Sequence, residues 1–161
     1  MIFGSSLKQL FNDLSISEHT VETSYGKQAE LDLFIKESDS LEAKKYPLIW
    51  WVTNQVEDQG NFLRCASKLV LMVNTDISWL SERRKINSFD TYISPLYEKV
   101  IDKLEKSAFK IHGDRRTRIK YQDIANYGIG SSKLGSKKSD KSIVTDYIDA
   151  RVIDITLDYY K

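Results

Sequence analysis

The first hydrophobic positions of the chain recur with the period of an α-helix. They follow i, i+4, i+7, i+8 spacing, and they are Phe3, Leu7, Leu10, Phe11 and Leu14. Residues with this spacing share one face of a helix and can pack together against a core. We therefore expect a short amphipathic helix over residues 2–14.

Residues 29–36 show a different pattern, in which apolar and polar positions alternate. The apolar set is Ala29, Leu31, Leu33 and Ile35. A period of two is typical of a strand with one buried face. We expect a strand here, followed by a polar loop over residues 38–47 that closes at a proline.

Two later runs are apolar at almost every position, "LIWWV" at residues 48–52 and "SKLVLMVNT" at residues 67–75. Such runs favour strands covered on both faces, so we expect them at the centre of a sheet. Neighbouring side chains of a strand point to opposite faces, which sends Trp50 and Trp51 into different layers. One of them needs cover from the N-terminal helix or from a neighbouring copy; the alternative is a three-layer core inside one chain.

The longest helical pattern begins at Ile86. Its apolar positions keep the helical phase for five turns, through Ile86, Phe89, Ile93, Leu96, Tyr97, Val100, Ile101 and Leu104. Ser94 and Pro95 suit the first turn of a helix, so we expect a kink or a restart there. We expect this helix to be the main packing element of the fold, with Phe89 in its core.

After this helix the sequence predicts a hairpin that turns near Gly113 and Asp114, a mobile Gly/Ser/Lys-rich loop over residues 127–142, and a closing strand over residues 149–160. Together the patterns predict a single α+β domain over residues 1–161. We expect a mixed or antiparallel sheet with the long helix on one face, the short N-terminal helix, and a basic hairpin and loop arm over residues 108–145.

Charge changes this picture only locally. The chain has 24 Lys+Arg against 23 Asp+Glu, and a net charge of +1 exerts no global pull toward nucleic acid or an anionic membrane. Between residues 115 and 141, however, there are eight basic residues and two acidic ones. The basic residues are Arg115, Arg116, Arg118, Lys120, Lys133, Lys137, Lys138 and Lys141. This arm can contact DNA phosphates, dock on the acidic body of another copy, or stay solvated.

Signals for catalysis are weak. The segment "GSSKLGSK" at residues 130–137 lacks the Gly-Lys-Ser/Thr order of a phosphate-binding loop. His19 and His112 have no partner at metal-ligand spacing, and Cys65, the only cysteine, suits a small buried residue. We expect no catalytic residue, metal or cofactor.

One arrangement keeps an alternative open. Asp32, Glu42 and Lys44 imitate the Asp, Glu-x-Lys set with which many nucleases hold Mg²⁺. That chemistry needs the glutamate and lysine on a rigid strand beside the aspartate. The alternative is therefore a DNA-binding or Mg²⁺-dependent nuclease-like protein that uses these residues and the basic arm.

The order of these segments resembles the tail-terminator and head–tail connector (neck) proteins of tailed bacteriophages, especially the crAss-like type. The resemblance covers about residues 46–158 and consists of pattern and order. Its features here are "YPLIWWV", a second strand ending in Asn-Thr, Trp79, Glu82-Arg83, Ser88-Phe89, Pro95-Leu96 and "DYIDA" at residues 146–150.

The resemblance implies a small α/β subunit without enzymatic activity that assembles into a ring of six or twelve copies around the DNA channel. The partners it implies are other copies, portal or adaptor and tail proteins, and possibly packaged DNA. It implies location in the virion neck or tail after synthesis in the host cytoplasm. Trp50, Trp51, Trp79 and Arg83 are the expected interface residues, and no apolar run is long enough to predict a membrane span.

Overall fold

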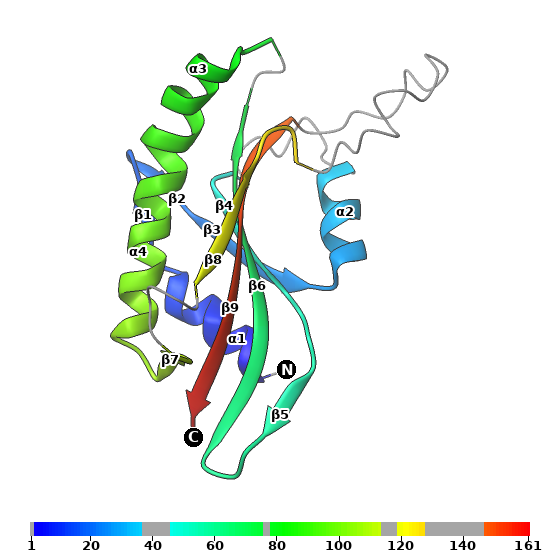
Figure 1. The fold of residues 1–161 in the computed structure, drawn as a ribbon, viewed down its shortest axis with the longest axis vertical. Coiled ribbons are helices and arrows are strands. Elements are labelled where there is room, and N and C mark those ends of the chain that lie inside the picture. Colours follow the sequence, from blue (N-terminus) through cyan, green and yellow to red (C-terminus); the bar gives the residue numbers. More distant parts are fainter. Residues whose placement is uncertain (1, 37–45, 76–77, 114–118, 128–146) are drawn as a thin grey trace.

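The computed structural model describes residues 2–36, 46–75, 78–113, 119–127 and 147–161. The chain has the expected α+β fold, in which a mixed sheet carries helices on both faces (Figure 1). The helical elements are α1 (Ile2–Phe11), α2 (Gln28–Lys36), α3 (Ser81–Arg84), the π-helical segment η1 (Lys85–Ile93) and α4 (Ser94–Glu105). The strands are β1 (Ser15–Ile16), β2 (His19–Thr20), β3 (Glu22–Gly26), β4 (Leu48–Val52), β5 (Val56–Asp58), β6 (Phe62–Asn74), β7 (Phe109–Ile111), β8 (Lys120–Ile124) and β9 (Ile148–Tyr160).

The two long strands β6 and β9 form the spine of the sheet. They pair antiparallel over 13 residues each, which gives a ladder about 44 Å long. The strand order is β3-β4-β6-β9-β7, with β5 on β6 and β8 on β9. Strands β3 and β4 are parallel, and the other pairs are antiparallel. Strand β3 therefore lies on one side of the central strands, and β7 and β8 lie on the other.

Both tryptophans of the "LIWWV" strand are buried inside the chain. Trp51 lies on the face covered by α1, with its ring centroid 5.0 Å from that of Phe3. Trp50 lies on the other face, 5.5 Å from the ring of Phe34 on α2, and its Nε1 donates a hydrogen bond to the Gly26 carbonyl. Their exposures are 1% and 5%, so a neighbouring copy is not needed to cover either one. Of the two alternatives for covering the tryptophans, the structure shows the three-layer core within one chain.

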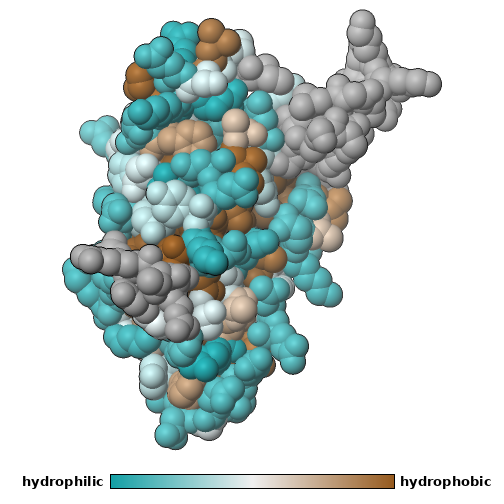
Figure 2. Space-filling view, viewed as in Figure 1, coloured by the Kyte–Doolittle hydropathy of each residue, from teal (hydrophilic) through white to brown (hydrophobic). Residues whose placement is uncertain are grey.

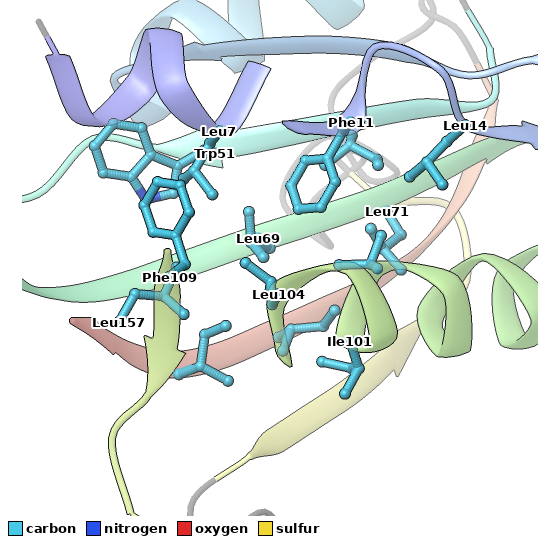
Figure 3. Close-up of a cluster of buried hydrophobic side chains, with 14 of the residues drawn as sticks. Leu7, Phe11, Leu14, Trp51, Leu69, Leu71, Ile101, Leu104, Phe109 and Leu157 are labelled. Atoms are coloured by element: carbon cyan, nitrogen blue, oxygen red, sulfur yellow. The ribbon is translucent and has the colours of Figure 1, made fainter. Parts of the chain in front are cut away.

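The larger of the two hydrophobic layers lies between the sheet and the pair α1 and α4. Leu7 and Phe11 of α1 and Ile101 and Leu104 of α4 converge on Leu69 and Leu71 of β6, with Trp51, Phe109 and Leu157 closing one end (Figure 3). The N-terminal helix thus packs as its spacing predicts, although it ends at Phe11 and the buried Leu14 follows it.

The strand expected at residues 29–36 is wrong, because these residues form α2. Leu31 and Ile35 are buried at 0% and 1% exposure, whereas Leu33 between them is 53% exposed. An i, i+4 pair lies on one face of a helix, and it packs here against the layer that contains Trp50. The segment is also rich in Ala, Glu, Leu and Gln, which have high helix propensity.

The long helix runs from Ser81 to Glu105, but only its second half keeps the predicted phase. Ile93, Leu96, Val100 and Leu104 are fully buried. In contrast, Ile86 is 53% exposed and Phe89 lies outside the buried core, so the assignment of Phe89 to the core is wrong. The cause is η1, where i→i+5 hydrogen bonding widens the turn and shifts the phase, so that Ser88 points inward.

The expected hairpin near Gly113 is also wrong. Strands β7 and β8 do not pair with each other; both pair antiparallel with β9, β7 beside Leu157 and Tyr159 and β8 beside Ala150 to Asp154. They lie end to end along the same side of β9. The closing strand is consequently a central strand of the sheet, since it separates β6 from β7 and β8.

Candidate subunit interface

The N-terminal part of the long helix carries apolar side chains that the rest of the described chain does not cover. Leu80 is 80% exposed and Ile86 is 53% exposed, while Trp79 and Phe89 are half-buried. We call these four residues the helical tip. Figure 2 shows hydrophobic surface at the top of the molecule, where Figure 1 places α3. Trp79, Leu80 and Phe89 also line one hollow of about 530 Å³.

A buried ion pair anchors the helical tip to the sheet. Arg84 Nη1 lies 2.5 Å from Asp149 Oδ1, and the two side chains are 8% and 0% exposed. The same guanidinium donates to Thr75 Oγ1 and Asn126 Oδ1, each at 3.2 Å, and to the Trp79 carbonyl at 3.3 Å. Arg84 therefore joins α3 to the end of β6, the start of β9 and the segment after β8.

Asp149 receives a second hydrogen bond, from the Asn126 backbone N–H at 3.2 Å. Its other oxygen, Oδ2, is buried and has no hydrogen-bond partner among the described residues. The negative charge of Asp149 is thus compensated mainly by Arg84, and burying it without that partner would cost several kcal/mol. The resemblance selected Arg83 as an interface residue. No spacing rule connects Arg84 to a residue 65 positions away, so the sequence did not reveal the ion pair.

A second arginine fixes the start of α4. Arg151 forms a bidentate pair with Asp123 at 2.7 and 3.0 Å and donates to Ser94 Oγ at 3.2 Å. Its guanidinium also lies 4.3 Å from the ring centroid of Tyr121. Burial alone lowers the pKa of Arg151, but the hydrogen bond and charge of Asp123 outweigh burial and raise the pKa. The helix is therefore held at two points on the sheet.

A larger cleft, of about 770 Å³, also has Trp79 in its lining. We call it the Trp79 cleft. The β1–β2 region, the starts of β3 and β4, the end of β6 and η1 contribute its described lining, which is Glu18, His19, Thr20, Glu22, Tyr46, Pro47, Val73, Asn74, Trp79, Asn87 and Tyr92. The rings of His19 and Tyr92 lie 6.1 Å apart. Two carboxylates and four aromatic or imidazole rings thus surround the cleft, and none of the described lining residues is a lysine or arginine.

The structure separates the four residues expected at an interface. Trp50 and Trp51 are interior, as described above. Trp79 is half-buried between the two hollows, and Arg83 is exposed on α3 beside the helical tip. Only the second pair is therefore placed where a partner can reach it.

The basic arm lies mostly outside the described residues. Lys120 is exposed at the start of β8. The remaining arm residues, Arg115, Arg116, Arg118, Lys133, Lys137, Lys138 and Lys141, lie outside the described ranges, as does the segment 130–137.

Only one of the three residues of the nuclease alternative lies in the described part of the chain. Asp32 lies on α2, where it accepts a hydrogen bond from Gln28 Nε2 at 3.1 Å, rather than on a strand. Glu42 and Lys44 lie outside the described residues. Within those residues no group of three or more His, Cys, Asp and Glu side chains is arranged to hold a metal ion.

A separate charged cluster lies near the C-terminal end of β9. Arg64 of β6 forms a bidentate pair with Asp158 at 2.7 and 2.9 Å, and His112 Nδ1 lies 3.3 Å from Asp158 Oδ2. The hydrogen bond from Arg64 holds the pKa of Asp158 below its ordinary value, although burial acts in the opposite direction. Cys65 beside it is buried as expected, and burial raises the pKa of its thiol.

No family model, curated protein or solved structure matches the chain. Among the described helices, none combines the length and the apolar character that crossing a bilayer would require.

Proposed function

We propose that the chain is a structural subunit of an oligomeric ring in the head–tail connector (neck) or tail-terminator region of a tailed bacteriophage. The ring would link portal to tail around the DNA channel, with six or twelve copies of the chain and with adaptor and tail proteins as partners. The observation that carries the proposal is the helical tip, an apolar surface that a buried ion pair anchors and that the rest of the described chain does not cover.

The helical tip has the properties of a contact surface. Full burial of a Leu or Ile side chain is worth about 1.5–3 kcal/mol, so covering Leu80 and Ile86 favours association. Two half-buried aromatic rings and the exposed Arg83 adjoin them, and Trp, Phe and Arg are enriched at protein interfaces. The Arg84 network holds these groups in place, which reduces the entropy lost when a partner binds.

The sheet also suits a ring, because a ring requires two different surfaces of one chain to meet. The β1 to α2 region, residues 15–36, carries four acidic residues and two lysines. The β7 to β8 region on the other side of the sheet, residues 110–124, carries five basic residues and two acidic ones. Of the charged residues in 110–124, Lys110, Lys120 and Asp123 lie within the described part of the chain. A net acidic stretch on one side of the sheet and a net basic stretch of sequence between β7 and β8 would favour head-to-tail contact over contact between like surfaces.

The test is assembly of the chain, measured as mass in solution and as copy number in the native particle. Ile86→Asp should reduce the assembled fraction without unfolding the subunit, because Ile86 is exposed in the isolated chain. Tyr160→Asp is the control, since Tyr160 is also exposed, at 48%, but lies at the end of β9, outside the helical tip and both charged regions. A chain that stays monomeric and is missing from the particle would refute the proposal.

A further inference from the structure

The Trp79 cleft has the chemistry of a site for a guanidinium group. Its carboxylates, on Glu18 and Glu22, can accept charge-assisted hydrogen bonds. The rings of His19, Tyr92 and Trp79 offer faces on which a planar cation stacks. A volume of about 770 Å³ falls in the range of ligand pockets and exceeds what one side chain fills. The occupant is therefore expected to be a segment with more than one contacting residue.

We propose that this cleft binds the arginine-rich segment 115–118 of a neighbouring copy of the chain. The segment reads Arg-Arg-Thr-Arg, so it supplies three guanidinium groups within four residues. The inference rests on the proposed ring, because it names the two surfaces that meet where one subunit follows the next. Its chemistry is complementary on both sides: carboxylates and rings in the cleft, planar cations on the segment.

Glu22 of the same chain lies far from the two strands that this segment connects. It connects β7 to β8, whereas Glu22 begins β3 on the other side of the sheet. Four strand spacings separate β3 from β8, which is about 19 Å. The register adds a further offset, since Glu22 is level with Ile124 rather than with Lys120.

Covalent geometry limits how far the segment extends. Arg116 is three residues from Gly113, so its Cα lies within about 11 Å of that residue. The distance from the β7/β8 side to Glu22 is more than about 20 Å, and an arginine side chain does not span the difference. Contact between this segment and Glu22 is therefore expected between two copies rather than within one chain.

The lysine-rich segment 130–141 is the competing occupant. It contains Lys133, Lys137, Lys138 and Lys141 but no arginine. A lysine ammonium is compact and strongly hydrated, whereas guanidinium is planar, less hydrated and able to pair with a carboxylate through two hydrogen bonds. Aromatic faces beside carboxylates therefore favour the arginine segment.

The first experiment measures binding of synthetic peptides to the isolated full chain by calorimetry. The probe is residues 112–120, and its control carries glutamine at positions 115, 116 and 118. The arginine peptide should bind at least about tenfold more tightly than the glutamine peptide, with an affinity that falls as salt rises. Equal affinities, or tighter binding of a peptide with residues 130–141, would overturn the inference.

Variants then locate the binding site. Glu18→Gln with Glu22→Gln should weaken binding of the arginine peptide about tenfold or more. Glu82→Gln with Asp90→Asn removes the same charge from exposed positions on the neighbouring helix that do not line the cleft, and should change the affinity less than threefold. Both pairs are exposed, so neither substitution threatens folding. Equal effects of the two pairs would show general electrostatic attraction and would refute the site.

Assembly separates this inference from the proposed ring. A charge exchange, Glu22→Lys with Arg116→Glu, should restore assembly that each single substitution weakens. If the ring forms normally in the Glu18→Gln, Glu22→Gln variant, the inference fails while the ring stands. If the arginine peptide binds in the cleft but the chain never assembles, the proposed ring fails while the cleft's specificity stands.

Discussion

Replacing Arg84 with Met tests whether the buried ion pair anchors the helical tip. The substitution removes the positive partner of Asp149, whose side chain is 0% exposed and which would retain the Asn126 N–H as its partner among the described residues. Removing one partner of a buried pair costs about 3–5 kcal/mol, because the other charge stays buried without compensation. The guanidinium also loses its hydrogen bonds to Thr75, Asn126 and the Trp79 carbonyl.

This cost is large compared with the free energy of unfolding of a typical domain, about 5–15 kcal/mol. The measurement is urea denaturation followed by tryptophan fluorescence and circular dichroism, with the free energy of unfolding extrapolated to water. Arg83→Met is the matched control: it makes the same chemical change at the adjacent, exposed position and should alter stability by less than about 0.5 kcal/mol.

A second variant distinguishes the lost charge from general damage. Arg84→Met combined with Asp149→Leu removes both charges and fills the space with apolar groups, so it should be more stable than Arg84→Met alone. The reasoning is refuted if Arg84→Met costs less than about 1 kcal/mol, or if the double variant is less stable than the single one.

Two further predictions concern packing and pH. Leu96→Ala should lower the free energy of unfolding by about 2–5 kcal/mol, because Leu96 is fully buried. Phe89→Ala should lower it less, because Phe89 is partly exposed. If thermal unfolding shows a larger loss of stability for Phe89→Ala, the described phase of η1 is contradicted. Asp158 has a folded-state pKa below its ordinary value of 3.8, so its ionised form stabilises the fold above that pH, and this contribution is lost as pH falls through the folded-state pKa. Arg64→Met removes the hydrogen bond that is the main cause of the lowered Asp158 pKa. In urea titrations the variant should therefore lose less stability than the parent as the pH falls from about 5 to about 2. An equal loss in the two proteins would show that Arg64 does not couple to the ionisation of Asp158.

The amphipathic pattern at the N-terminus and the two apolar runs were sufficient to predict α1, β4 and the apolar part of β6. In these segments the apolar positions predicted from the local period are the positions that are buried, so each element could be predicted without knowing what packs against it. The alternation in residues 29–36 misled because Leu31 and Ile35 satisfy both a period of two and an i, i+4 pair. Which of the two forms is decided by the layer of Trp50, which a helix covers here.

The candidate site was predicted only in part. Trp79 and Arg83 were selected from the sequence and lie where a partner can reach them, whereas Leu80 and Ile86 were not selected as exposed residues. Ile86 fits the helical spacing of the apolar positions that follow it, which is why it was expected to be buried. The sequence carries no signal for the π-helical segment η1, which turns Ile86 away from the core.

By itself, the sequence determined the class of the fold, the buried character of "LIWWV" and the segregation of basic residues after the long helix, because these depend on composition and local period. Only the tertiary structure decided what covers each tryptophan, which strands flank β9, and that Arg84 meets Asp149. Those features join residues far apart in the chain, and contacts of this kind depend on how whole elements pack rather than on the pattern within any one of them.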